Sequence, residues 1–157
     1  MVTVRGGGSG RVSIAGLVAT RPDRPTRLIY RTRIHRGRRR EPKALTENDY
    51  IGLLDAAHQQ LGGPIMLVWD NLPTHRSARM RTLIAARPWL TVFFLPTYAP
   101  ELNPVEAVWA HLKHTLVNLA RRGLDQLVGL IKTRLRRMQY RPVLLAGFVA
   151  KTGLNPA

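Results

Sequence analysis

The stretch PIMLVWDNLPTH, from Pro64 to His75, joins an uncharged apolar run to an acid, an amide and a proline turn. The apolar run predicts a buried strand, and Asp70 then stands at its carboxyl end. In open α/β sheets, ligand sites lie at the carboxyl ends of strands. Asp70 is therefore a candidate site residue, although Asp-Asn before Leu-Pro is also ordinary turn chemistry.

A second stretch rich in turn and capping residues, PTYAPELNPVEAVW, runs from Pro96 to Trp109. Asn103 is a good N-cap, Pro104 suits the first helical position, and Glu106 follows three residues after the cap. Apolar residues then recur at helical spacing, at Val105, Val108, Trp109, Leu112, Leu116 and Leu119. The pattern predicts a helix with Glu106 in its first turn. Glu106 could also serve only as the capping-box partner of Asn103.

The remaining segments alternate between strand and helix patterns. An alternating strand with one basic, half-exposed face is predicted at Arg27–Arg36, and Asp49 takes the capping-box position of the helix after Thr46. The other predicted elements are strands at Arg11–Thr20, Pro64–Asn71 and Leu90–Pro96, and helices at Thr46–Gly62, Ser77–Pro88, Leu124–Met138 and a short one from Pro142. This order predicts one α/β domain over residues 1–157, with a mixed sheet flanked by helices.

Asp70 and Glu106 are brought to one edge of that sheet if their strands are neighbours. Two carboxylates close together repel unless a cation lies between them. Their hard oxygen atoms select Mg²⁺ or Mn²⁺, which activate water or a hydroxyl group in phosphoryl transfer. Spacing alone leaves the metal site and the turn-and-cap interpretation both open.

The composition points to an anionic partner. Lys and Arg number 25 against 9 acids, a net charge of +16, and the first interpretation is nucleic acid binding rather than a merely solvated basic surface. No apolar run reaches the roughly 18 residues that span a bilayer, and a membrane-surface role is disfavoured. The absence of cysteine fits a reducing, cytoplasmic setting. The candidate DNA-binding residues are Arg31, Arg33, Arg36, Arg38, Arg39 and Arg40.

Together, VWDNLPTH and LPTYAPELNPVEAVWAHLK resemble the catalytic core of DDE-superfamily transposases, in the mariner-related branch of bacterial insertion sequences. The resemblance, over about Arg11 to Ala120, implies a ribonuclease-H-like fold. It also implies two-metal nicking and strand transfer of DNA, at transposon ends and target, and a homodimer in the full-length protein. It assigns Asp70 and Glu106 as catalytic Mg²⁺ (or Mn²⁺) ligands, with Asn71, His75 and Asn103 in support.

One departure from that family qualifies the expectation. The family's first catalytic Asp lies on a strand before a glycine-rich turn like the one at Gly6–Gly10, and no acid precedes Asp23 here. The first, central strand is therefore expected to be missing, and the chain alone to be inactive. A non-catalytic DNA-binding remnant or a pseudogene product are the alternatives, and a nucleoid-associated location is expected for a DNA-binding chain.

Two other patterns carry less weight. His111 and His114 lie three residues apart, and with His75 they could form a zinc site, although the chain has no cysteine. Trp69 and Trp109 are interpreted as core residues rather than as platforms for nucleic acid bases.

Overall fold

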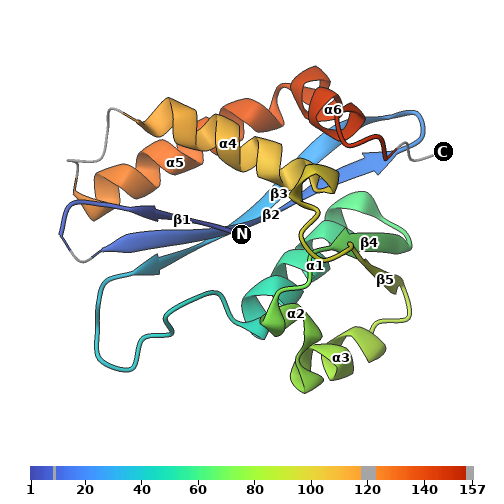
Figure 1. Cartoon of the computed structure of the whole chain (residues 1–157), viewed down its shortest axis with the longest axis horizontal. Coiled ribbons are helices and arrows are strands. Elements are labelled where there is room, and N and C mark those ends of the chain that lie inside the picture. The colour runs from blue at the N-terminus through green and yellow to red at the C-terminus, as the bar shows by residue number, and fades with distance from the viewer. Residues whose placement is uncertain (9, 118–122, 155–157) are drawn as a thin grey trace.

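The computed structural model describes residues 1–8, 10–117 and 123–154, and the fold is mixed α/β (Figure 1). Leu119 of the predicted helical stripe lies outside these residues. The elements in chain order are β1 (Val2–Arg5), β2 (Arg11–Arg21), β3 (Arg24–His35), α1 (Glu47–Leu61), β4 (Ile65–Trp69), α2 (Pro73–Arg76), α3 (Ala78–Ala85), β5 (Leu90–Phe94), the 3₁₀ turn η1 (Pro100–Leu102), α4 (Pro104–Leu116), α5 (Leu124–Gln139) and α6 (Pro142–Ala150).

The strands form two sheets within the described residues. β1, β2 and β3 pair antiparallel in that order, and β4 pairs parallel with β5. The expected single mixed sheet is therefore divided in two, between the strands β1 to β3 and the strands β4 and β5. The expectation that no strand precedes the glycine-rich turn is wrong, because β1 pairs with β2 from Val2 opposite Ile14 to Arg5 opposite Arg11.

The β2–β3 hairpin is longer than its sequence suggested. The turn consists of Pro22 and Asp23, and Asp23 adopts a positive φ of 60°. Pro25 lies inside β3, where the pairing register shifts between Ala19 and Arg21. Proline is tolerated at such an irregularity because no ladder N–H is needed there. Both strands therefore run closer to the turn than the predicted bounds of Arg11–Thr20 and Arg27–Arg36.

Each face of the three-stranded sheet packs against a different set of helices (Figure 1). Val12, Ile14 and Leu28 join a core with α4, α5 and α6, whereas Ala15 and Ile29 join a second core with α1, β4 and β5. Trp109 lies fully buried against Gly16, where an added Cβ would come within 2.8 Å of its ring. Trp69 is also buried, so the prediction that both tryptophans are core residues is confirmed.

The prediction of a half-exposed strand with a basic face is confirmed for β3, and the start of α1 lies against part of that face. Asp49 in the first turn of α1 accepts from Arg33 Nη2 at 2.9 Å, and Arg31 Nε lies 3.5 Å from the same carboxylate. Asp49 Oδ2 also accepts from the backbone N and the Oγ1 of Thr46, as the predicted capping position requires. Two arginines of the predicted basic face therefore hold α1 on the sheet.

The small sheet is buried on one face only. Leu67 and Trp69 of β4 point into the second core, whereas Met66 and Val68 are 78% and 50% exposed, and Phe93 of β5 is 52% exposed. The prediction of fully buried strands is therefore wrong for β4 and β5. In the described part of the chain, α4 to α6 pack on β2 and β3 instead, and no helix there is long and apolar enough to cross a membrane.

Candidate active site at the end of strand β4

Asp70 follows β4 directly and is held by a histidine from the next turn. His75 Nδ1 lies 2.8 Å from Asp70 Oδ1 and 3.2 Å from the Asp70 carbonyl oxygen. The backbone N–H of Leu72 also donates to Oδ1, at 3.4 Å. The second oxygen, Oδ2, accepts no hydrogen bond from any described residue, and the side chain is 36% exposed. Asp70 is thus fixed in place with one oxygen open.

His75 is buried between two aromatic rings. Its imidazole stacks on Trp69 with ring centres 4.0 Å apart and meets the edge of Tyr50 at 4.6 Å. Both groups facing Nδ1 are pure acceptors, so the proton belongs on Nδ1. Nε2 is buried without a partner among the described residues.

The electrostatics of Asp70 follow from this contact. Burial raises its pKa, but the hydrogen bond from His75 and the nearby positive charges outweigh burial, so the pKa lies below its ordinary value. Asp70 is therefore ionised at neutral pH and available as an anionic ligand.

Glu106 lies in the first turn of α4, as its position after the cap predicted. Asn103 Oδ1 accepts from the Val105 backbone N–H at 3.2 Å, which confirms the N-cap. The backbone N–H of Asn103 donates instead to Pro100 O at 3.0 Å, so Glu106 does not close a capping box. Glu106 is exposed, and its carboxylate makes no hydrogen bond or ion pair with the described residues.

The Met1 α-amino group is influenced by both carboxylates. Burial lowers the pKa of the Met1 α-amino group, and Asp70 and Glu106 both oppose that effect by attracting its positive charge. The amino group at the start of β1 is therefore within electrostatic range of both acids. Lys113, seven residues after Glu106 in α4, repels the amino group more weakly and lowers its pKa.

Asn71 ties the strand ends together. Its Nδ2 donates to Leu95 O, just past β5, and its Oδ1 accepts from the guanidinium of Arg76. Arg76 also lies over the Phe94 ring, 4.2 Å from its centre. Because the amide is engaged at both ends, Asn71 sets the position of the loop that carries Asp70.

Tyr50 belongs to this site although the sequence indicated only a core position in α1. It packs against His75, and burial followed by the charges of Asp70 and Asp49 raises its pKa to about 12. Its helical spacing gave no signal of this role, because a buried stripe residue and a site wall have the same periodicity.

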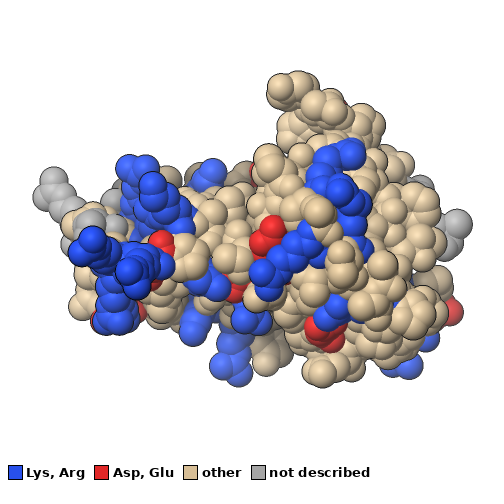
Figure 2. Space-filling view, turned by 90° about the horizontal axis from the view of Figure 1, so that it is seen from below, with Lys and Arg blue, Asp and Glu red and all other residues tan. Residues whose placement is uncertain are grey.

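The predicted DNA-binding arginines fall into two groups. Arg31 and Arg33 pair with Asp49, and Arg36 pairs with Asp125 at 2.8 Å. Arg38, Arg39 and Arg40 are exposed in the following loop and form no ion pair within the described residues. Figure 2 shows Lys and Arg side chains spread over one face of the molecule with isolated acids among them.

Glu41 holds that loop in shape. Its carboxylate accepts from the backbone N–H groups of Arg36, Gly37 and Arg38, and these bonds lower its pKa. A hollow of about 280 Å³ lies against the loop, lined by Arg11, His35, Gly37, Arg38, Arg40, Glu41, Pro42 and Lys43. Three arginines and a lysine around one open space suit an anionic ligand.

The zinc interpretation gains no support. Over residues 1–8, 10–117 and 123–154, no group of three or more His, Cys, Asp or Glu side chains is placed to hold a metal ion. His111 instead lies near the Phe148 ring, with centres 6.1 Å apart. The acidic pair of Asp70 and Glu106 offers two ligand side chains rather than three.

The mixed α/β fold is of the ribonuclease-H-like kind found in transposase catalytic domains. Residues 30–127 match the model of the DDE superfamily endonuclease family, and the chain belongs to that family. The fold is similar to the catalytic domain of the Mos1 mariner transposase, with a TM-score of 0.50 and 13% identity, covering 93% of this chain and 83% of that one.

A weaker likeness is to a chain in the intasome of simian T-cell lymphotropic virus in complex with the PP2A regulatory subunit B56 gamma. That match has a TM-score of 0.44 and 13% identity, and it covers 79% of this chain and 46% of the other. Among curated protein sequences, none matches this chain.

Proposed function

We propose that this domain catalyses metal-dependent phosphoryl transfer on DNA as part of a transposase, with Asp70 and Glu106 as the catalytic ligands. The observation that carries the proposal is their placement: Asp70 follows β4 directly, Glu106 lies in the first turn of α4, and each has oxygen atoms without a partner among the described residues. A cation bound between two such anions would relieve their mutual repulsion.

The donor set fits a small hard cation. Asp70 Oδ2 is open and Glu106 is exposed, so both can supply carboxylate oxygen atoms. Mg²⁺ is commonly held by one or two carboxylates together with water and substrate phosphates. Enzymes of the DDE superfamily generally depend on divalent metal ions. When bound, such an ion would polarise the phosphate and favour attack by a hydroxyl group or water.

The neighbouring residues have positioning roles in this proposal. His75 holds Asp70 through Nδ1, and the stack on Trp69 fixes the ring that does so. Asn71 fixes the loop between Trp69 and Pro73 by bonding to Leu95 and Arg76. Asn103 starts α4 and so sets the direction from which Glu106 approaches. Errors of about 1 Å in such placement can cost on the order of a hundredfold in rate.

The DNA substrate is supported by charge as well as by family. The net charge of +16 favours a polyanion, and Arg38, Arg39 and Arg40 are exposed without acidic partners in the described structure. Phosphate contacts of this kind make binding fall steeply as salt rises. We assign transposon ends and target DNA as the substrates, and a cytoplasmic, nucleoid-associated location follows from them.

Metal binding tests the proposal directly. Mn²⁺ titrated into the isotope-labelled chain is expected to broaden backbone NMR signals around Asp70 and Glu106 first. Asp70→Asn and Glu106→Gln should each weaken this broadening at least tenfold in Mn²⁺ concentration, because each removes one of two charged ligands. Asp125→Asn is the matched control, since Asp125 is an exposed first-turn acid of α5, at a position comparable to Glu106 in α4. Equal broadening in all variants, or a centre elsewhere, would refute the site.

A plasmid-nicking assay separates this proposal from a non-catalytic DNA-binding role. With two carboxylates rather than three in the described structure, Mg²⁺-dependent nicking by this chain alone is expected to be undetectable or very slow. Mn²⁺ broadening at Asp70 without nicking fits that expectation. DNA binding with no metal effect at Asp70 would favour the non-catalytic role instead.

A further inference from the structure

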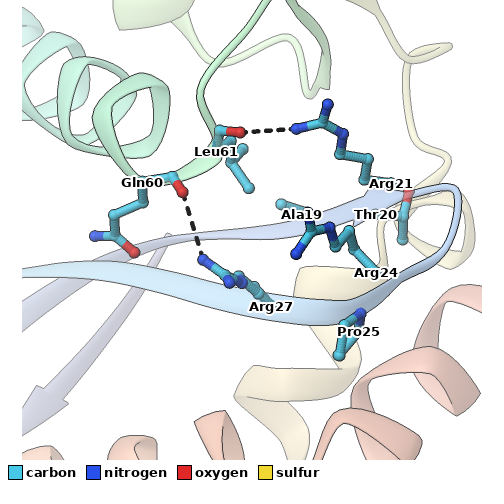
Figure 3. A pocket seen from close by; sticks show the side chains of 8 residues that line it. All are labelled: Ala19, Thr20, Arg21, Arg24, Pro25, Arg27, Gln60 and Leu61. Atoms are coloured by element: carbon cyan, nitrogen blue, oxygen red, sulfur yellow. Dashed lines mark hydrogen bonds between the residues drawn. The ribbon is translucent and has the colours of Figure 1, made fainter.

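The tip of the β2–β3 hairpin and the carboxyl end of α1 enclose a second basic hollow, separate from the one beside Glu41. Its volume is about 210 Å³. It is lined by Ala19, Thr20, Arg21, Arg24, Pro25, Arg27, Gln60 and Leu61 (Figure 3). Three of these eight residues are arginines, and none is an acid.

Two of the arginines are held in place by the helix end. Arg21 Nη1 donates to Leu61 O at 3.0 Å and Gly62 O at 3.4 Å, and Arg27 Nη1 donates to Gln60 O at 3.4 Å. These carbonyls form the negative end of the α1 dipole. A guanidinium has five N–H donors, so each arginine keeps donors for another acceptor. Both side chains are thus oriented in advance with binding capacity left over.

Arg24 has no such structural role. Its side chain lies between those of Arg21 and Arg27 (Figure 3), yet it makes no hydrogen bond or ion pair with any residue that the structure describes. Asp23 is adjacent in the turn but forms no ion pair with it. Capping of α1 accounts for Arg21 and Arg27 and leaves Arg24 unexplained.

Three positive charges around an open hollow repel one another unless an anion lies between them. The planar guanidinium fork matches phosphate oxygen atoms, which makes arginine the usual choice for phosphate recognition. A site this open suits one phosphate in a longer chain, because a free ion would remain largely hydrated there.

We propose that Arg21, Arg24 and Arg27 form a phosphodiester-binding site for a nucleic acid backbone, outside the candidate active site. The hollow lies at the carboxyl end of α1, which precedes β4 in the chain, whereas Asp70 follows that strand, whose five residues span about 16 Å at ~3.3 Å per residue. This inference rests on DNA being the substrate, as proposed above.

Fluorescence anisotropy with a random-sequence 30-base-pair duplex tests the site in the full chain. Arg24→Ala is expected to weaken binding roughly tenfold at low salt, because a charge-assisted contact is lost. It should also reduce the slope of log K against log salt by about one. Arg24→Lys should keep the slope and lose part of the affinity. Arg79→Ala is the control, because it removes an equal charge from an exposed arginine already bonded to Asn48 Oδ1.

The outcomes are distinguishable. If the wild-type chain does not bind the duplex, the proposed DNA substrate is wrong and this inference falls with it. If the wild-type chain binds and Arg24→Ala behaves like Arg79→Ala, only the hairpin site is wrong. If inorganic phosphate binds the wild type but not Arg24→Ala, and DNA at matched ionic strength binds both equally, the hollow binds free phosphate and not DNA, which also overturns the proposal. Unchanged thermal unfolding of Arg24→Ala will verify that the hairpin still folds.

Discussion

Asp49 at the start of α1 and Asp70 at the end of β4 both lie beside a basic side chain, but they differ in how fully their oxygen atoms are used. Asp49 is 4% exposed, and both its oxygen atoms accept hydrogen bonds, from Arg33 and Thr46. Asp70 is more exposed, and only Oδ1 accepts from His75 and Leu72. A buried, saturated carboxylate stabilises the fold, whereas an open one remains available to a ligand.

The largest effect is expected from Asp49→Ala. The substitution leaves Arg33 partly buried without its carboxylate and removes the acceptor for the Thr46 N–H. A loss on the order of 3 kcal/mol in the free energy of unfolding is expected, because removing one partner of a buried ion pair leaves the other charge without compensation. Urea denaturation followed by circular dichroism measures it.

Asp125→Ala provides the contrast for that experiment. Asp125 also pairs with an arginine, Arg36, but its side chain is 78% exposed. Its loss should cost less than about 1 kcal/mol, as for other exposed ion pairs. Equal losses in the two variants would show that burial and saturation do not separate these acids.

The next effect concerns the open acid, through His75→Phe. Phenylalanine can keep the stack on Trp69 but has no Nδ1 donor for Asp70. The pKa of Asp70 should rise, because the burial that raises it remains while its principal hydrogen bond is lost. Mn²⁺ affinity should fall roughly tenfold, as for other partners that orient metal ligands. A ¹³C NMR titration of the Asp70 carboxyl and the Mn²⁺ titration measure the two effects.

His58→Phe is the matched control for His75→Phe. His58 stacks on Trp89 with ring centres 4.0 Å apart, and its Nδ1 faces a backbone carbonyl, that of Gly63. The environment is therefore alike except for the carboxylate. If both variants left the Asp70 pKa and Mn²⁺ affinity unchanged, the positioning role of His75 would be wrong.

The smallest effect is expected from Asp55→Asn. Both oxygen atoms of Asp55 accept from Arg87, but its side chain is 42% exposed, so it is saturated without being buried. The difference in unfolding free energy from the wild type should stay below about 1 kcal/mol.

The pH dependence of that difference carries a definite sign. The hydrogen bond from Arg87 lowers the Asp55 pKa below its ordinary value of 3.8, against the opposing effect of burial. The stabilisation is therefore present above about pH 3.8 and lost as pH falls through the folded pKa. The unfolding free energies of the wild type and Asp55→Asn should differ at pH 6 and become equal below about pH 3. A gap that persists at low pH would contradict the linkage.

The local features of this chain were readable from sequence because their causes are local. Asn103 caps α4 and Gly62 ends α1 in a left-handed conformation, as the capping patterns predicted. Parts of the fold that depend on distant partners were not readable. The four residues of β1 are a strand only because β2 pairs with them, and the contact of the basic β3 face with α1 depends on Asp49, 16 residues after Arg33.

The same distinction applies to the candidate site. The position of Asp70 at a strand end and of Glu106 at a helix start followed from the apolar periodicity and from the turn and capping residues in the sequence. The stack of His75 on Trp69 and the approach of Tyr50 did not, because they depend on how α1 packs across β4. The binding roles of Asp70, Glu106 and the loop arginines stay predictions.

The division of the interior into two cores has a consequence for the order of folding. The core of α1, β4, α3 and β5 draws mainly on residues between 45 and 92, so its contacts close short loops. The other core joins β1 to β3 with α4 to α6, and Gln139 reaches Leu28 O across 111 residues. Short loops close at lower entropic cost and generally form faster. During synthesis, the N-terminal hairpin must therefore wait with its apolar face uncovered until the last helices leave the ribosome.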